Sequence, residues 1–112
     1  MYQEDDAPSG SDNLTQLLLD YFDDVGLDAE AASLGGGSDH GSFMRGGIPI
    51  GGLFAGASEV KSTDEAATFG GQAGQPEDPC YHLACDRLDQ VNLDVLDQLA
   101  DAVAFAVVAL AS

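Results

Sequence analysis

Pro79-Cys80-Tyr81-His82-Leu83-Ala84-Cys85-Asp86 is the stretch around which this chain is organised, because it holds both cysteines and one of the two histidines. Two cysteines five positions apart cannot be joined along a regular helix, since a disulfide requires Cα atoms within about 7 Å. Pairing them would force a tight bend and direct the intervening His82 outward. So short a ring removes only about 2 kcal/mol of chain entropy. We therefore interpret the stretch as a turn that fixes one side chain as a metal ligand.

The residue types also allow other interpretations of this turn. Cys80, His82, Cys85 and the distant His40 form a Cys2His2 inventory. Their spacing departs from the paired C-x2-4-C and H-x3-5-H pattern of structural zinc sites. A single histidine near a turn is also more often a hydrogen-bonded structural residue than a ligand. From the residues alone, both roles stay open for His82.

The composition indicates a packed protein segment. A length of 112 residues suits one small domain or part of one. Hydrophobic residues make up 45%, which excludes a disordered acidic tail, and 14 glycines predict many turns. The first six residues lack both a basic start and an apolar region, so any export signal lies elsewhere.

The charge balance is strongly acidic, with 20 Asp and Glu against three Lys and Arg and a formal net charge of −17. Nucleic acid and anionic membrane surfaces are therefore poor partners, because little here neutralises phosphates. Such a surface suits concentrated salt, where the Debye length falls to about 3 Å at 1 M. We hypothesise a halophile origin; the alternative is an acidic surface that serves solubility alone.

The first half of the chain alternates between strand and helix patterns. Residues 1–13 are predicted to be a strand stub followed by a loop. Apolar residues from Leu14 to Val25 recur with helical spacing, with Asp12 as the capping residue and Gly26 at the end. Residues 27–34 are predicted to form a short strand in preference to a second helix.

The middle of the chain is rich in glycine. Residues 35–40 are predicted to be a turn leading into a helix start, with Ser38 or Asp39 as the cap. The apolar run 48–54 predicts a buried strand near the middle of a sheet. Residues 55–79 are predicted to be one long glycine-rich loop.

Ser38, Asp39 and His40 are the residue types of a hydrolase triad. Neighbours in sequence point in different directions, however, and a triad is defined by its spatial geometry, so we disfavour this interpretation. The preceding glycines lack a phosphate-binding pattern.

Residues 92–111 are predicted to form the closing helix, with Asn92 as N-cap. Its apolar end is shorter than the roughly 20 residues of a membrane span, which favours a buried terminal helix. Asp97 and Asp101 lie one turn apart and could offer oxygens to calcium, although two carboxylates are too few by themselves. A solvated acidic face is the simpler interpretation of this pair.

Four stretches in this order and spacing resemble the C-terminal part of the two-zinc aminopeptidases of metallopeptidase family twenty-eight. They are Gly37–Phe43, Ile48–Ala57, Phe69–Gln75 and Cys80–Asp86, and with their gaps they span most of the chain. The resemblance implies an α/β fold: a partial mixed sheet flanked by helices, in the C-terminal half of a zinc-exopeptidase (phosphorylase/hydrolase-like) fold. This chain would supply the last strands and the closing helices of one peptidase domain.

The resemblance also implies a peptidase that removes N-terminal residues from peptides with two zinc ions. His82 matches a zinc ligand, and Tyr81 matches a hydrogen-bond donor to the oxyanion. Cys80 and Cys85 match a disulfide pair. Phe54 matches a residue lining the pocket for the first side chain of the substrate.

Several family residues are not found here. Of five zinc ligands and a catalytic Glu, only the final His has a match, so the implied partner is the missing N-terminal half of the domain. The Arg that precedes Ser-Asp-His in many similar enzymes is replaced by Gly37, whereas Asp97 and Asp101 match a calcium-binding pair in some relatives. We expect the isolated chain to be inactive and the parent enzyme to be extracellular or secreted. The alternative is a non-catalytic acidic module that binds peptides or cations.

Overall fold

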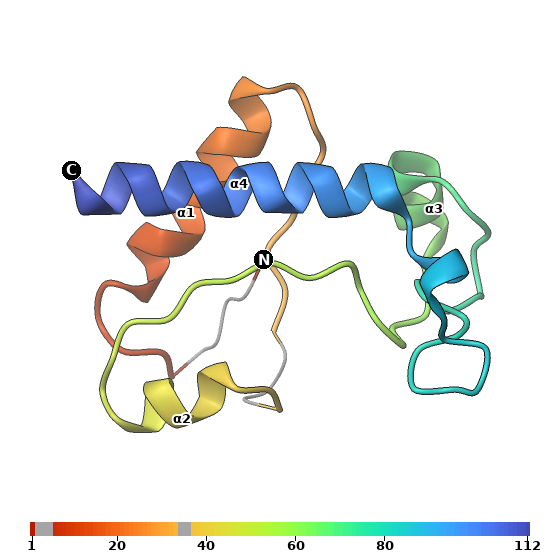
Figure 1. The fold of residues 1–112 in the computed structure, drawn as a ribbon, viewed down its shortest axis with the longest axis horizontal. Helices are drawn as coiled ribbons and strands as arrows, with labels where there is room; N and C mark the ends of the chain where they lie inside the picture. Colours follow the sequence, from red (N-terminus) through yellow and green to blue (C-terminus); the bar gives the residue numbers. More distant parts are fainter. Residues whose placement is uncertain (2–5, 34–36) are drawn as a thin grey trace. The chain divides into compact units, whose positions relative to one another are not determined.

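The computed structural model describes residues 1, 6–33 and 37–112 (Figure 1). Within them the elements follow in the order α1 (Ser11–Asp24), α2 (His40–Arg45), α3 (Thr63–Phe69), the 3-10 helix η1 (Leu88–Gln90) and α4 (Leu93–Ala111). The chain divides into two compact units. Unit 1 comprises Met1–Leu53 and Asp101–Ser112, and unit 2 comprises Phe54–Ala100.

The predicted α/β fold with a mixed sheet is wrong for this chain. The structure is 47% helix and 3% strand, and its described residues form no sheet. An apolar run becomes a strand only when a second extended segment exchanges backbone hydrogen bonds with it. That pairing depends on residues far away in the sequence, so the pattern of one run does not specify it.

Each predicted strand shows a different outcome. For the strand stub and loop predicted at residues 1–13, residues 6–10 form neither helix nor strand, as the loop requires, but α1 already begins at Ser11; residues 2–5 lie outside the described part. Residues 27–33 form no strand, and residue 34 lies outside the described residues. Even so, the Met1 amine donates to the Glu30 carbonyl at 2.7 Å, and the Ala32 N–H donates to the Met1 carbonyl at 2.7 Å. Two bonds tie the first residue to this segment without building a strand.

Residues 48–54 also form no strand, although residues 49–51 lie against the start of α1. The buried N–H of Ile50 donates to Ser11 Oγ at 3.0 Å. A Cβ added to Gly51 would lie 2.7 Å from Leu14 Cβ, closer than real side chains approach, so this position requires glycine. Ile50 is therefore buried as predicted, but its backbone N–H binds a side chain of α1 rather than a neighbouring strand.

The predicted first helix is confirmed as α1, with Leu18 and Phe22 on its buried face. It begins before the predicted cap: Gly10 is the N-cap residue at a positive φ of 101°, which places Asp12 in the first turn. A carboxylate there still favours the helix through its dipole. On the same helix, Tyr21 stacks on Phe105 with ring centroids 4.8 Å apart, which joins α1 to the end of α4 within unit 1.

Unit 2 contains a paired segment that the long-loop prediction missed. The carbonyls of Ala57 and Glu59 accept hydrogen bonds of 2.8 Å from the N–H groups of Asp78 and Glu77. Between the two sides lies α3, which begins at a capping box. In that box Ser62 Oγ accepts from Glu65 N at 3.1 Å, and the Glu65 carboxylate accepts from Ser62 N at 2.6 Å.

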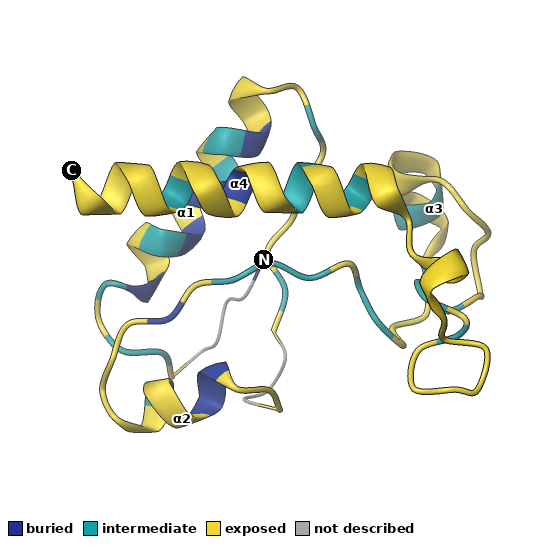
Figure 2. Cartoon of the chain, viewed as in Figure 1, coloured by how far each residue is buried: buried dark blue, intermediate teal, exposed yellow. Residues whose placement is uncertain are grey.

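The closing helix is confirmed as α4, and Asn92 caps it by accepting from the N–H groups of Asp94 and Val95 at 3.1 and 3.2 Å. Its predicted burial is wrong: Ala102 is the residue of α4 that is buried, and much of the helix is exposed (Figure 2). Within the described residues, no helix combines the length and apolar character needed to cross a bilayer.

Candidate functional site

The turn at residues 78–86 starts from the paired segment of unit 2. Asp78 is fixed to Ala57 by its backbone N–H at 2.8 Å. Its side-chain Oδ1 then accepts from Cys80 N at 2.8 Å, and its carbonyl accepts from Tyr81 N at 3.3 Å. An aspartate that binds the backbone two residues later makes an Asx turn. The direction of the chain entering the cysteine ring is therefore set by Asp78.

The disulfide between Cys80 and Cys85 is present, with Cα atoms 5.3 Å apart. Inside the ring, Leu83 N donates to the Cys80 carbonyl at 2.9 Å. His82 has a positive φ of 58°, a left-handed conformation that non-glycine residues seldom adopt. This backbone conformation costs on the order of 1–3 kcal/mol and persists only where the surrounding structure constrains it. The ring closure supplies that constraint.

The side chains of Tyr81 and His82 lie together on the outside of this ring. Their ring centroids are 4.0 Å apart with an interplanar angle of 41°. Both residues are exposed. The turn therefore presents a phenol and an imidazole next to each other, which can donate a hydrogen bond and ligate a metal ion respectively.

The base of the turn is held by residues to which sequence reasoning gave no role. Lys61 Nζ lies 2.8 Å from Glu77 Oε2 and donates to the Gly70 carbonyl at 2.8 Å. Gly56 has a positive φ of 89°, and a side chain there would overlap the Glu77 side chain. Two signals were readable in the sequence: an Asp two residues before a Cys, and a Ser-x-x-Glu capping box. The Lys61 and Gly56 contacts carry no such local signal.

The metal donors that this chain brings together are few. Among the described residues, no group of three or more His, Cys, Asp and Glu could hold a metal ion. Both cysteines are in the disulfide, so the Cys2His2 interpretation is wrong. A zinc ion in a protein takes three or four protein ligands. The residues present therefore fit one imidazole contribution to a zinc site, from His82, and no complete site.

The other predicted site residues lie in separate places. Phe54 is half-buried at the beginning of unit 2, the unit that contains Tyr81 and His82, and its role as a pocket wall stays a prediction. Asp97 and Asp101 are exposed on α4. Their role as a calcium pair also stays a prediction.

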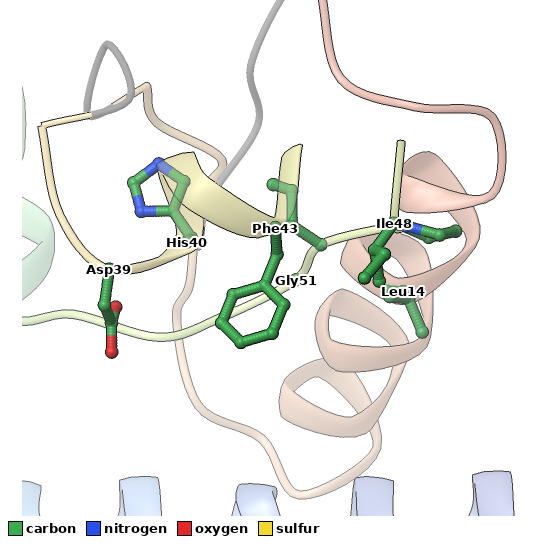
Figure 3. Close-up of a pocket in the computed structure, with 8 residues that line it drawn as sticks. Leu14, Asp39, His40, Phe43, Ile48 and Gly51 are labelled. Carbon is green, nitrogen blue, oxygen red and sulfur yellow. The ribbon is translucent and has the colours of Figure 1, made fainter. Parts of the chain in front are cut away.

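Two of the three triad-type residues, Asp39 and His40, line an open hollow of about 320 Å³ in unit 1 (Figure 3). Ser38 Oγ donates to Asp39 Oδ1 at 3.4 Å. His40 is buried at the start of α2, and its ring and the Asp39 carboxylate point apart. The geometry therefore does not support a Ser-His-Asp relay. Most of the lining is apolar: Leu14, Phe43, Ile48, Pro49 and Ile50.

Comparison with known proteins relates nearly the whole chain to one family. The model of peptidase family M28 matches residues 3–107. Leupeptin-inactivating enzyme 1 of Streptomyces exfoliatus is 41% identical over 104 residues, which cover 92% of this chain and 23% of that protein. An aminopeptidase of Pseudomonas aeruginosa is 39% identical over 99 residues, covering 88% of this chain and 18% of the relative.

A fungal relative agrees with these two. The probable leucine aminopeptidase 2 of Aspergillus oryzae is 39% identical over 101 residues, covering 90% of this chain and 20% of the relative. The chain thus spans about a fifth of the length of the curated relatives it matches.

Proposed function

This chain belongs to peptidase family M28, and from that premise we propose that it is the C-terminal part of a zinc-dependent aminopeptidase that contributes Tyr81 and His82 to the active site. The observation that carries the proposal is the geometry of the disulfide-bonded turn. It places a phenol and an imidazole 4.0 Å apart, on the exposed side of a closed ring.

His82 would supply one ligand of the zinc site. The ring closure limits the movement of its backbone, which lowers the entropy lost when its imidazole binds a metal ion. The remaining ligands and the catalytic Glu would come from polypeptide outside these 112 residues. When bound, the two zinc ions supply a water of lowered pKa and stabilise negative charge on the scissile carbonyl oxygen.

The phenol of Tyr81 would donate a hydrogen bond to the scissile carbonyl oxygen as negative charge develops on that oxygen. A neutral donor of fixed direction stabilises the transition state and adds no charge next to the metal ions. Its position beside His82 keeps the donor close to the ligand. Tyr81 is therefore proposed as the catalytic residue of this segment.

The substrates would be peptides with a free N-terminus. Several relatives carry the name leucine aminopeptidase, which favours an apolar first residue. Phe54 would contact that first side chain. Gly37 stands where many similar enzymes have an Arg, and so offers no cation to the substrate. We propose that the parent enzyme is secreted; Asp97 and Asp101 would bind calcium only with ligands from elsewhere.

The test is a chimera in which residues 1–112 replace the matched segment of the Streptomyces exfoliatus enzyme. With zinc, we expect it to hydrolyse leucine p-nitroanilide. His82→Ala should abolish activity and lower the zinc content. Tyr81→Phe should lower kcat by about 100-fold, as for other oxyanion donors, with the zinc content unchanged. The isolated 112 residues should be inactive.

Two outcomes would contradict the proposal. If His82→Ala left both activity and zinc content unchanged, His82 would not be a ligand. If the isolated chain released p-nitroaniline with zinc, its catalytic groups would all have to lie within it.

A further inference from the structure

Among the residues that the structure describes, two that are not glycine have a left-handed backbone. They are Ala57, with a φ of 49°, and His82, with a φ of 58°. Residues with a side chain seldom adopt this conformation, and where they do, the surrounding structure constrains them. The disulfide ring constrains His82. Strained backbone positions cluster at functional sites, so the constraint on Ala57 also requires an explanation.

Asp78 binds the bend at Ala57 from the opposite side of the paired segment. Its N–H donates to the Ala57 carbonyl at 2.8 Å, and Glu77 N donates to the Glu59 carbonyl at 2.8 Å. Glu59 N in turn donates to the Gly56 carbonyl at 3.0 Å. Ala57 and Asp78 are both half-buried, and a hydrogen bond shielded from water is stronger than an exposed one. The backbone of Ala57 is therefore fixed against Asp78.

The same aspartate binds the disulfide-bonded turn. Its Oδ1 accepts from Cys80 N at 2.8 Å, and its carbonyl accepts from Tyr81 N at 3.3 Å. On the other side of this connection, Phe54 precedes Ala57 by three residues. Along the chain, by contrast, the whole of α3 separates Phe54 from Tyr81. Asp78 thus provides a short connection between the residue proposed to contact the first side chain of the substrate and the turn that carries the catalytic phenol.

We infer that Asp78 is a positioning residue that fixes Phe54 relative to Tyr81, and that it thereby sets the preference of the enzyme for a large first side chain. This inference rests on the proposed function, which assigns Phe54 to the first side chain and Tyr81 to the scissile carbonyl oxygen.

The chemistry of the substrate requires these two contacts to be matched. The first side chain and the scissile carbonyl carbon are bonded to the same Cα atom, so neither group can shift without the other. Binding of the side chain orients the carbonyl only when the two protein groups are held at a fixed separation. A leucine substrate uses both contacts, whereas an alanine substrate has little side chain to reach Phe54. Loosening the connection therefore lowers the turnover of a leucine substrate more than that of an alanine substrate.

The test uses the chimera with the Streptomyces exfoliatus enzyme. We would compare Asp78→Ala and Asp78→Asn with the unmodified chimera, and measure kcat/KM for leucine p-nitroanilide and for alanine p-nitroanilide. Ser62→Ala is the matched control. It also removes a side-chain acceptor from a backbone N–H of unit 2, that of Glu65 at 3.1 Å, but one that caps α3 and does not bind the turn.

Asp78→Ala should lower the ratio of the two kcat/KM values, leucine over alanine, by about tenfold, with the zinc content unchanged. Asp78→Asn keeps an acceptor for Cys80 N–H and should retain the ratio within about twofold. Ser62→Ala should lower the melting temperature and leave the ratio unchanged. Because the ratio does not depend on how much enzyme is folded, a loss of stability alone does not alter it. An unchanged ratio in Asp78→Ala would overturn the inference, as would an equal fall in Ser62→Ala or an unmodified chimera that does not prefer leucine.

A double-mutant cycle tests whether Asp78 acts through Phe54. Phe54→Ala should itself lower the ratio, and adding Asp78→Ala should lower it no further. Independent losses that multiply in the double variant would contradict the inference.

Hydrogen exchange distinguishes a failure of the proposed function from a failure of this inference. In the chimera, mass spectrometry of peptic fragments should show that Asp78→Ala speeds exchange both in residues 54–60 and in residues 78–86, whereas Ser62→Ala speeds it within α3. Faster exchange in both segments of an inactive chimera would reject the proposed function and retain the connection. Faster exchange in residues 78–86 alone would reject the connection, whether or not the chimera is active.

Discussion

The N–H of Cys80 donates a 2.8 Å hydrogen bond to Oδ1 of Asp78, two residues earlier in the chain. The backbone N–H of the same aspartate is bound to Ala57 across the paired segment. One residue therefore connects the tertiary framework of unit 2 to the ring that carries His82.

Asp78→Ala should lower the free energy of unfolding by about 1–3 kcal/mol, because it leaves the partly buried Cys80 N–H without its acceptor. Asp78→Asn retains an acceptor and should lose less. Urea unfolding followed by circular dichroism measures both variants. Equal stability of Asp78→Ala and the unmodified chain would show that the turn does not depend on this bond.

Removing the disulfide should affect His82 more than it affects the stability of the chain. Closing a loop of this length contributes only about 2 kcal/mol, but the ring holds His82 at a φ of 58°. We expect Cys80→Ser with Cys85→Ser to lower the zinc affinity of the chimera while the helical signal persists. Competition with a zinc-binding dye measures the affinity, and an unchanged affinity would contradict the role of the ring.

Lys61→Met should destabilise the chain by about 1–3 kcal/mol, because it leaves the Glu77 carboxylate and the Gly70 carbonyl without their cationic donor. Lys61→Arg keeps the charge and should lose less. Arg45→Met is a suitable control, since its bond to Ser42 is exposed. Thermal unfolding of the three variants should rank them in this order, and an equal loss for Arg45→Met would refute a special role for Lys61.

Gly51→Ala should destabilise unit 1 by about 1–3 kcal/mol, because the added methyl group would overlap Leu14. Leu14→Ala removes apolar contacts and should also destabilise. Combined, the two changes should cost less than the sum of their separate effects, since the smaller side chain makes room for the methyl group. Additive losses in urea titrations would show that these residues do not contact each other.

Raising the salt concentration from 0.1 M to 3 M should raise the melting temperature of the chain. The carboxylates that give the chain its formal charge of −17 repel one another across the surface, and salt screens that repulsion. Exposed aspartates such as Asp23 and Asp24 on α1 contribute to it. A melting temperature that is constant or falls with salt would reject the halophile hypothesis.

Much of the candidate site was predictable because its determinants are local. The adjacency of Tyr81 and His82 is covalent, and the spacing of Cys80 and Cys85 allows a short ring around them, but the pairing of the two cysteines was expected from the family resemblance. The Asx turn at Asp78 was also readable but was missed. The ion pair between Lys61 and Glu77 could not be predicted, because it depends on the pairing of two segments that lie sixteen residues apart.

The sequence by itself determined the two longest helices of this protein, α1 and α4, whereas α3 lies in the segment that was predicted to be a loop. The apolar spacing of α1, the glycine at Gly26 and the cap at Asn92 act within a few residues, so they hold whatever surrounds them. Tertiary structure alone decided that Ile50 binds Ser11 rather than a neighbouring strand, and that Phe105 of α4 stacks on Tyr21 of α1. Both contacts require two segments that are distant in the sequence to meet. The sequence pattern of one segment does not specify which other segment packs against it, so the pattern does not predict the contact.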